Sequence, residues 1–350
     1  MSAVKAAFES QSRACAKLGS PFMARLMALA ADRLRPGTAV ADRVLGWQGD
    51  PSANADSVPL RFAGALHALK RSGAGTLAQV YPPAEASDDS LWSGVEAAMA
   101  DHSAFLLDRL DLPPQTNEVR RSAAVTPALH IVANRFGLPI DLVEVGCSAG
   151  LNLRGDRFHL KAGDAAYGPP EAPVQLAPDW TGDAPPAAEL RIASRTGLDL
   201  NPLDPAREAD RLVSYIWPDQ PDRIARTQAA IDIASSTPAD LVRTDAVDWL
   251  EQNLRPRDGR ASFLFHTIAW QYLPEPARLR GDAAIAAAGA MARENAPLAR
   301  FAMEAAGPYA SLSLQLWPGA VILPLGRADY HGRWIAWGDA ASARERSDGD

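Results

Sequence analysis

The chain has 350 residues, with 35 basic and 42 acidic side chains and a formal net charge of -7. This length can bury a large core, either as one large domain or as two of ordinary size. The acidic balance and the lack of a dense Lys/Arg run argue against nucleic acid as a partner. Cys15 and Cys147 are the two cysteines, so a disulfide framework is not expected and a reducing compartment is favoured.

Neither a membrane nor a metal is expected as a partner. The N-terminal sequence is polar throughout, unlike a signal peptide, and no run approaches the ~20 apolar residues of a membrane span. We therefore expect a cytoplasmic protein. The 6 histidines are scattered and the cysteines are far apart, so no zinc site is predicted.

Helical spacing of apolar residues dominates the first 140 residues. In "SPFMARLMALAADRLRPG", Ser20 can cap a helix, Pro21 suits its first turn, and Pro36-Gly37 ends it. Further helices are expected in "PLRFAGALHALKRSG", "SLWSGVEAAMADHSAFLLDRL" and "TPALHIVANRFG", the last ending at Gly137. We predict a helical N-terminal region over residues 1–118, acting as a lid or substrate-binding region.

After residue 138 the pattern changes to short apolar runs that alternate with helical segments. "IDLVEVG" is expected to be a buried parallel strand, and similar runs occur in "LRIASRTGLDL", "ADLVRTDA", "ASFLFHTIAW" and "LARFAMEAA". Strands alternating with helices imply a parallel sheet with right-handed crossovers. The stretch "LSLQLWPGAVILPLGRADYHGRWIAWG" instead predicts consecutive strands at an antiparallel edge.

These patterns predict an α/β domain over residues 119–340, with a Rossmann-like, mostly parallel sheet and an antiparallel edge. A Gly- and Pro-rich insertion at 157–190 has room for a small hairpin. Residues 341–350 are expected to form a flexible polar tail.

The stretch "LVEVGCSAGLNL" contains two overlapping motifs. The first is G-x-S-x-G, the nucleophile elbow of serine hydrolases, formed by Gly146, Cys147, Ser148, Ala149 and Gly150. A triad can be written in the right order as Ser148, Asp245 and His266, or with Asp329 and His331. An elbow normally follows several strands and an upstream oxyanion loop, whereas this motif follows the first strand. Serine hydrolysis is therefore our third hypothesis.

Starting at Glu144, the same stretch is E-x-G-x-S-x-G, an acid followed by a turn of small residues. In an open parallel sheet, this turn approaches a ligand where the strand order reverses. Gly146 and Gly150 let the backbone pass close to a ligand, while Ser148 and Ala149 leave space. Amides at the start of the next helix can meet a carboxylate, and Glu144 can accept from an ammonium group. A ligand with an amino-acid moiety is therefore favoured.

This pattern resembles motif I of the class I S-adenosylmethionine-dependent methyltransferases, usually acid-x-Gly-x-Gly-x-Gly, with Ser148 at the middle glycine. Nearly the full length also resembles an uncharacterised bacterial family, a domain of unknown function assigned to the methyltransferase-like folds. The blocks that carry this resemblance include "QTNEVRRSAA", "LVEVGCSAGLNLRGDRF", "GLDLNPLDP", "YIWPDQPDR", "FHTIAWQYLP" and "HGRWIAWG". The resemblance implies a class I methyltransferase sheet with S-adenosylmethionine as cofactor.

By the same analogy, acids after the second and third strands contact the cofactor. Asp199 would hold the ribose hydroxyls, with a helix cap as the alternative, for which Asp204 is the stronger candidate. Asp245 and the Ala246 amide would meet the adenine, again with a helix cap as the alternative. The expected cofactor-binding residues are Glu144, Gly146, Cys147, Ser148, Ala149, Gly150, Asn152, Asp199, Asp245, Ala246 and His266.

Polar and aromatic side chains near these strand ends predict a substrate pocket. Its expected residues are Gln115, Thr116, Asn117, Arg121, Asp156, Arg157, Trp270, Gln271 and Tyr272. For the 115–118 cluster the alternative is a capping box, and for Trp270 it is ordinary packing. His266 and Glu118 are the candidate general bases, needed only for a protonated nucleophile, and a buried core histidine is the alternative for His266.

The leading hypothesis is therefore methyl transfer to an unidentified small molecule, with the helical region covering the substrate. Such a transfer is an in-line displacement that depends on orientation. The alternative is a non-catalytic module that binds S-adenosylmethionine or S-adenosylhomocysteine. It is favoured by Ser148 at the glycine position and by the missing N-P-P-Y acceptor motif.

Overall fold

The computed structural model describes residues 2–338. The chain divides into two compact units. A helical unit comprises the residues up to Thr116 together with 208–225, and a sheet unit comprises 117–207 and the residues from 226 onward. The sequence places the boundary after 118 and assigns 208–225 to the α/β domain, so the structure differs mainly in that segment. The predicted tail lies outside the described residues.

Amphipathic helices build the helical unit around its own apolar core. Ser20 caps α2 as predicted, because its hydroxyl accepts from the Met23 amide, and Pro21 is the first helical residue. Asp219 accepts from the Ser20 hydroxyl (2.6 Å) and from the Phe22 amide (3.0 Å), which ties segment 208–225 to α2. The elements are α1 (Ala3–Lys17), α2 (Pro21–Arg33), α3 (Ala39–Leu45), α4 (Val58–Arg71), η1 (Leu77–Gln79), α5 (Asp88–Asp101), α6 (Ser103–Leu110) and α8 (Ala209–Ser214).

The sheet unit contains a nine-stranded sheet in the order β5-β12-β11-β10-β9-β8-β1-β6-β7. Strands β7, β6, β1, β8 and β9 are parallel, and β9 to β12 form an antiparallel meander, as predicted. The strands are β1 (Ile140–Val145), β5 (Asp179–Thr181), β6 (Ile192–Asp199), β7 (Asp240–Arg243), β8 (Ala261–Thr267), β9 (Leu298–Ala306), β10 (Tyr309–Trp317), β11 (Val321–Ala328) and β12 (Trp334–Trp337).

The insertion contains the predicted hairpin, formed by β2 (His159–Ala162) and β3 (Ala165–Tyr167). Together with β4 (Gln175–Leu176) it makes a separate three-stranded sheet. Strand β5, also from the insertion, pairs in parallel with β12 at the edge of the large sheet.

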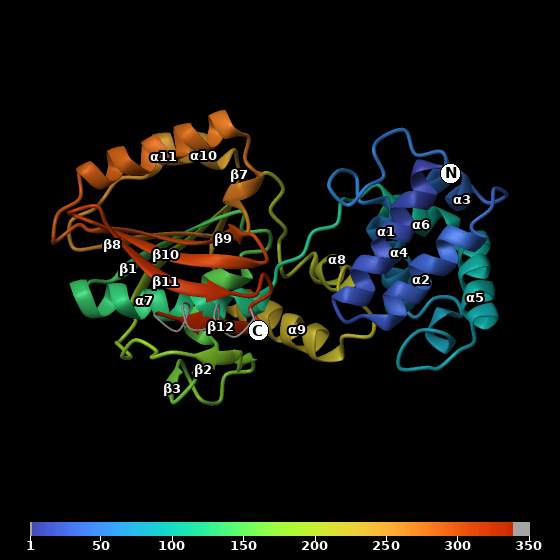
Figure 1. Cartoon of the computed structure of the whole chain (residues 1–350), viewed down its shortest axis with the longest axis horizontal. Coiled ribbons are helices and arrows are strands. Elements are labelled where there is room, and N and C mark those ends of the chain that lie inside the picture. Colours follow the sequence, from blue (N-terminus) through green and yellow to red (C-terminus); the bar gives the residue numbers. More distant parts are fainter. Residues whose placement is uncertain (1, 339–350) are drawn as a thin grey trace, which may run out of the picture. The chain divides into compact units, whose positions relative to one another are not determined.

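Helices cover both faces of the large sheet: α10 and α11 lie along one face and α7 along the other (Figure 1). Val143 and Val145 of β1 belong to a buried cluster with Leu250 of α10 and Ile285 of α11. Because side chains alternate along a strand, Glu144 points to the opposite face. The remaining elements are η2 (Val119–Arg121), α7 (Ser122–Phe136), η3 (Leu151–Arg157), α9 (Pro221–Ser236), α10 (Ala246–Asn253), η4 (Trp270–Tyr272) and α11 (Glu275–Ala290).

The strand order reverses beside β1. From β1 the chain continues to β6 and β7 on one side, and then crosses to β8 and β9 on the other. The carboxyl ends of these strands therefore meet at one edge, where open α/β sheets bind ligands. Within residues 2–338, we find no helix with the length and apolar character needed to cross a membrane.

Candidate functional site

The turn after β1 has three residues in the left-handed region. Gly146, Ser148 and Gly150 have φ angles of 72°, 52° and 64°. The Gly146 and Cys147 amides both donate to the Leu198 carbonyl of β6, at 2.8 and 3.2 Å. A left-handed conformation costs a non-glycine residue about 1–2 kcal/mol. Ser148 therefore adopts the backbone conformation that glycine favours, at some cost in strain.

Neighbouring side chains pack closely against this turn. A Cβ on Gly146 would lie 2.6 Å from the Ala269 Cβ, and a Cβ on Gly150 would lie 2.8 Å from the Leu241 side chain. The Cys147 thiol is buried, with Sγ 2.6 Å from where a Cβ on Gly197 would be. Packing thus already requires these glycines, and burial raises the pKa of Cys147, which keeps the thiol protonated.

Glu144 is a buried acid at the carboxyl end of β1, with 2% of its surface exposed. It accepts a hydrogen bond from the Asn152 side chain, whose own oxygen accepts from the Ser122 hydroxyl at 2.7 Å. Its Oε2 atom has no hydrogen-bond partner within residues 2–338. Burial raises the pKa of Glu144 to about 8, so the carboxyl group is mostly protonated at neutral pH.

Asp199, at the end of β6, holds the turn in place. Its two oxygens accept from the backbone amides of Ser148 and Asn201, both at 2.8 Å. Each carboxylate oxygen can accept a further hydrogen bond. Neither Asp199 nor Asp204 caps the next helix: Asp204 accepts from the Ala206 amide within a turn, and the N-cap residue of α8 is Glu208. The next residue, Leu200, is 72% exposed at this edge.

The start of the following helix differs from the expectation. η3 is a short 3-10 helix, and the amide of its first residue, Leu151, donates to the Asn117 side chain at 2.8 Å. Arg154, buried in η3, donates to the Gly150 carbonyl at 2.7 Å and to the Thr237 carbonyl. Because the Leu151 amide already donates to Asn117, it is not available to a ligand carboxylate, and the role of the helix start in ligand binding stays a prediction.

Asp245 caps α10, as the alternative interpretation proposed. Its Oδ1 accepts from the Val247 and Asp248 amides at 2.8 and 3.1 Å. Ala246 is the first residue of that helix. The side chain of Asp245 is exposed, so a further contact with a ligand stays a prediction.

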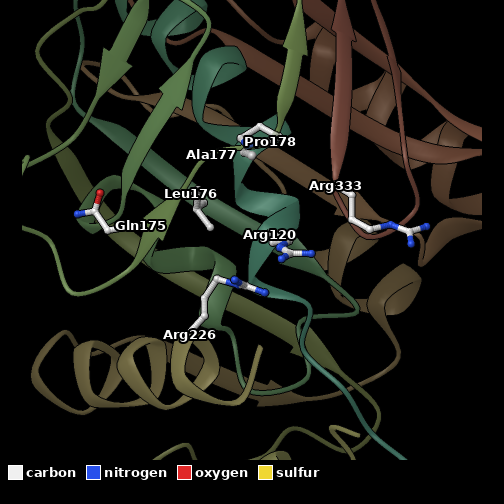
Figure 2. A pocket seen from close by; sticks show the side chains of 9 residues that line it. Arg120, Gln175, Leu176, Ala177, Pro178, Arg226 and Arg333 are labelled. Carbon is white, nitrogen blue, oxygen red and sulfur yellow. The ribbon is translucent and has the colours of Figure 1, made fainter. Parts of the chain in front are cut away.

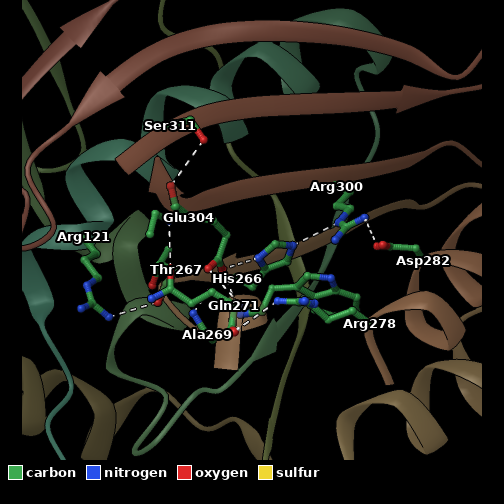
Figure 3. Close-up of polar contacts among 12 residues, drawn as sticks. Arg121, His266, Thr267, Ala269, Gln271, Arg278, Asp282, Arg300, Glu304 and Ser311 are labelled. Atoms are coloured by element: carbon green, nitrogen blue, oxygen red, sulfur yellow. Dashed lines mark hydrogen bonds and ion pairs between the residues drawn. The ribbon is translucent and has the colours of Figure 1, made fainter. Parts of the chain in front are cut away.

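His266, at the end of β8, has both ring nitrogens bound to protein groups (Figure 3). Arg300 Nε can only donate, so Nε2 accepts from it at 3.1 Å and the ring proton lies on Nδ1, which donates to Glu304 at 2.7 Å. Burial lowers the pKa of His266, which keeps the ring neutral. No nitrogen is left for a substrate, so this geometry does not favour the predicted role as a general base.

Glu304 of β9 is a residue that the sequence analysis missed. In addition to His266, it accepts from the Ala269, Trp270 and Gln271 amides, at 3.1, 3.0 and 3.3 Å. Burial alone would raise the pKa of Glu304, but these hydrogen bonds bring it below its ordinary value. An ionised Glu304 therefore fixes the loop after β8.

That loop contacts the turn after β1 through Ala269, and it contains a strained residue. Ile268 has a φ of 51°, which is rare for a β-branched side chain. The carbonyl of Thr267 accepts from Arg121 at 3.0 Å, and the Gln271 side chain accepts from the Ala305 amide. Strain of this kind concentrates at functional sites.

The other predicted pocket residues have diverse surroundings. Trp270 is buried, with the centre of the His266 ring stacked 4.9 Å from the centre of its own ring, whereas Tyr272 is 75% exposed.

The polar residues predicted for the pocket lie elsewhere. Asp156 forms an ion pair with Arg195 at 2.6 Å, and Arg157 lies mostly exposed beside Asp156. Glu118 is buried and accepts from the Arg120 amide. Gln115 and Thr116 belong to the helical unit, and Asn117 begins the sheet unit.

The hydrolase triad is not assembled. The Ser148 hydroxyl has no hydrogen-bond partner within residues 2–338, while His266 binds Glu304 and Asp245 caps a helix. In the second arrangement, Asp329 binds Arg333 at 2.7 Å and accepts from the backbone amide of His331. Neither arrangement links the serine to a histidine.

Comparison with known proteins identifies a family. Residues 5–337 match the family described as "Uncharacterized protein conserved in bacteria (DUF2332)". The chain belongs to this family. The resemblance to an uncharacterised bacterial family of unknown function, noted from the sequence blocks, is therefore confirmed. Comparisons with curated proteins and with solved structures found no match.

Proposed function

We propose that this DUF2332 protein is an S-adenosylmethionine-dependent methyltransferase that acts on a small molecule. The observation that carries the proposal is the left-handed turn at 146–150, which lies where the strand order reverses. Glu144 precedes this turn and Asp199 binds its middle amide. The parallel strands around β1 agree with the Rossmann-like methyltransferase architecture that motif I implies.

The polar groups of this edge suit the cofactor. Two buried oxygens, Glu144 Oε2 and Ser148 Oγ, have no partner within residues 2–338. The cofactor ammonium, placed beside Glu144, would lower the pKa of this carboxyl group, so that Glu144 ionises on binding and accepts from the ammonium. Asp199 would accept from the ribose hydroxyls. The exposed Leu200 offers an apolar surface to a planar base. When bound, S-adenosylmethionine would supply the electrophilic methyl group.

The chain's own contribution to such a reaction is orientation. Glu304 fixes the loop after β8 against the turn after β1, and Asp199 fixes the turn itself. An in-line displacement gains most of its rate from such positioning. Because His266 is fully hydrogen-bonded, we assign it a positioning role in the loop and not proton transfer.

A second candidate is a module that binds the same nucleotides without turnover. The occupied nitrogens of His266 are the observation that favours it. Transfer of labelled methyl groups from S-adenosylmethionine to molecules of a cell extract would support the methyltransferase. Tight binding without any turnover would support the module.

Calorimetry with S-adenosylmethionine tests the proposal. We expect saturable binding by the wild type, and binding at least about tenfold weaker in Glu144→Gln, which loses a charge-assisted contact. Asp141→Asn is the matched control, because Asp141 is also buried on β1 but already binds Ser194 and Arg257. Absence of binding by the wild type would overturn the proposal.

A further inference from the structure

A cavity of about 300 Å³ in the sheet unit has a strongly cationic lining. Arg120 comes from η2, Arg226 from α9 and Arg333 from the turn before β12, while Leu176 and Pro178 provide an apolar wall. The volume lies at the small end of the range for small-molecule sites. None of the residues of the turn at 146–150 lines this cavity.

The charges around the cavity are unevenly compensated. Arg333 forms an ion pair with Asp329 at 2.7 Å, and the charge of Glu118 also acts on Arg333. Within residues 2–338, the Arg120 guanidinium has no hydrogen bond or ion pair, since the contact with Glu118 uses its backbone amide. The side chain of Arg226 extends from α9 toward Arg120, and both line the cavity (Figure 2).

A guanidinium without a counter-charge in a partly enclosed space, such as that of Arg120, is destabilised, and a bound anion would remove this cost. The planar guanidinium binds carboxylate and phosphate oxygens through paired hydrogen bonds. We propose that this cavity binds the oxyanion group, carboxylate or phosphate, of a compact small molecule whose apolar part lies against Leu176 and Pro178.

The site does not depend on the proposed methyl transfer. Arg120 is nevertheless adjacent in sequence to a residue that contacts the candidate cofactor edge. This residue is Arg121, which donates to the Thr267 carbonyl at the end of β8. An anion bound by Arg120 would therefore be held by the same turn that contacts this edge.

Titration of the full chain with inorganic phosphate, and separately with succinate at matched ionic strength, tests the inference. We expect saturable binding of at least one anion, weakened at least about tenfold in Arg120→Gln. Arg120→Lys keeps the charge but loses the paired geometry, so intermediate affinity is expected. Phosphate binding alone would indicate a phosphorylated ligand, and succinate binding alone a carboxylate.

Arg207→Gln is the control, because Arg207 is 86% exposed, lies outside the cavity and loses the same charge. Its affinity should equal that of the wild type. If Arg120→Gln does not fold by circular dichroism, Arg226→Gln carries the same expectation. The inference fails if neither anion saturates the wild type, or if the cavity variants bind as tightly as Arg207→Gln. Neither result depends on whether S-adenosylmethionine binds.

Discussion

Glu144 gives the site a pH dependence that can be measured in the stability of the whole protein. Its pKa is about 8 in the folded chain, against an ordinary value of 4.5. Between these values the unfolded chain releases the proton and the folded chain keeps it, so the free energy of unfolding falls as pH rises. The slope for this one group is at most about 1.4 kcal/mol per pH unit.

Glu144→Gln has a similar shape but does not titrate. We therefore expect its free energy of unfolding, relative to that of the wild type, to increase steadily from about pH 4.5 to about pH 8 and to be constant below that window. Urea unfolding at several pH values measures this difference. A difference that stays constant across the window would contradict the raised pKa.

Residues whose role depends on their immediate neighbours could be predicted from the sequence. Ser20 caps α2, Gly137 ends α7 in a left-handed conformation, and Asp245 caps α10. Asn117 was expected in the substrate pocket, but its contact with the Leu151 amide and the role of Glu304 could not be predicted, because each binds a backbone amide more than thirty residues away. Such partners depend on strand order and loop path, which local patterns do not specify.

At the level of elements, Glu304 joins β9 to the loop that follows β8. Glu304→Ala would leave three loop amides and the His266 ring without their acceptor. Hydrogen bonds to a charged group contribute about 1.5–3 kcal/mol each. We expect the variant to lose at least about 2 kcal/mol in urea unfolding and the amides of 269–271 to exchange faster with deuterium.

The control is Glu251→Ala, which removes exposed ion pairs with Arg280. Pairs of this kind contribute about 1 kcal/mol or less, so its loop exchange should match the wild type. If both variants lose the same stability and the loop exchange stays slow, then Glu304 does not hold the loop.

Element type was more predictable than element order. Apolar runs identified β1, β6, β7, β8 and β9, and their alternation with helices indicated a parallel sheet. The helix predicted for 90–110 is instead divided at His102, whose ψ of 32° is not helical. The pairing of β5 with β12 could not be seen, because a three-residue strand from an insertion carries too little pattern.

At the scale of the whole molecule, the chain enters the helical unit twice, through the first 116 residues and again through 208–225. The sequence predicts a helical segment in "PAREADRLVSYIW", residues 205–217, but it does not show which core this segment joins. Contacts such as that between Asp219 and Ser20 decide this, and they link residues almost two hundred positions apart. A segment that returns to an earlier unit, such as 208–225, therefore cannot be recognised from local sequence patterns alone.

Two compact units predict thermal unfolding that departs from a single two-state transition. Leu66 of α4 is fully buried in the core of the helical unit, and Leu264 of β8 is fully buried between the sheet and its helices. Truncation of a buried leucine to alanine costs about 2–5 kcal/mol. We expect the calorimetric trace to contain two transitions, with Leu66→Ala lowering the midpoint temperature of one and Leu264→Ala that of the other. S-adenosylmethionine should raise the midpoint temperature of the transition that Leu264→Ala lowers. If both variants instead shift one common transition by similar amounts, the two units unfold as one cooperative body.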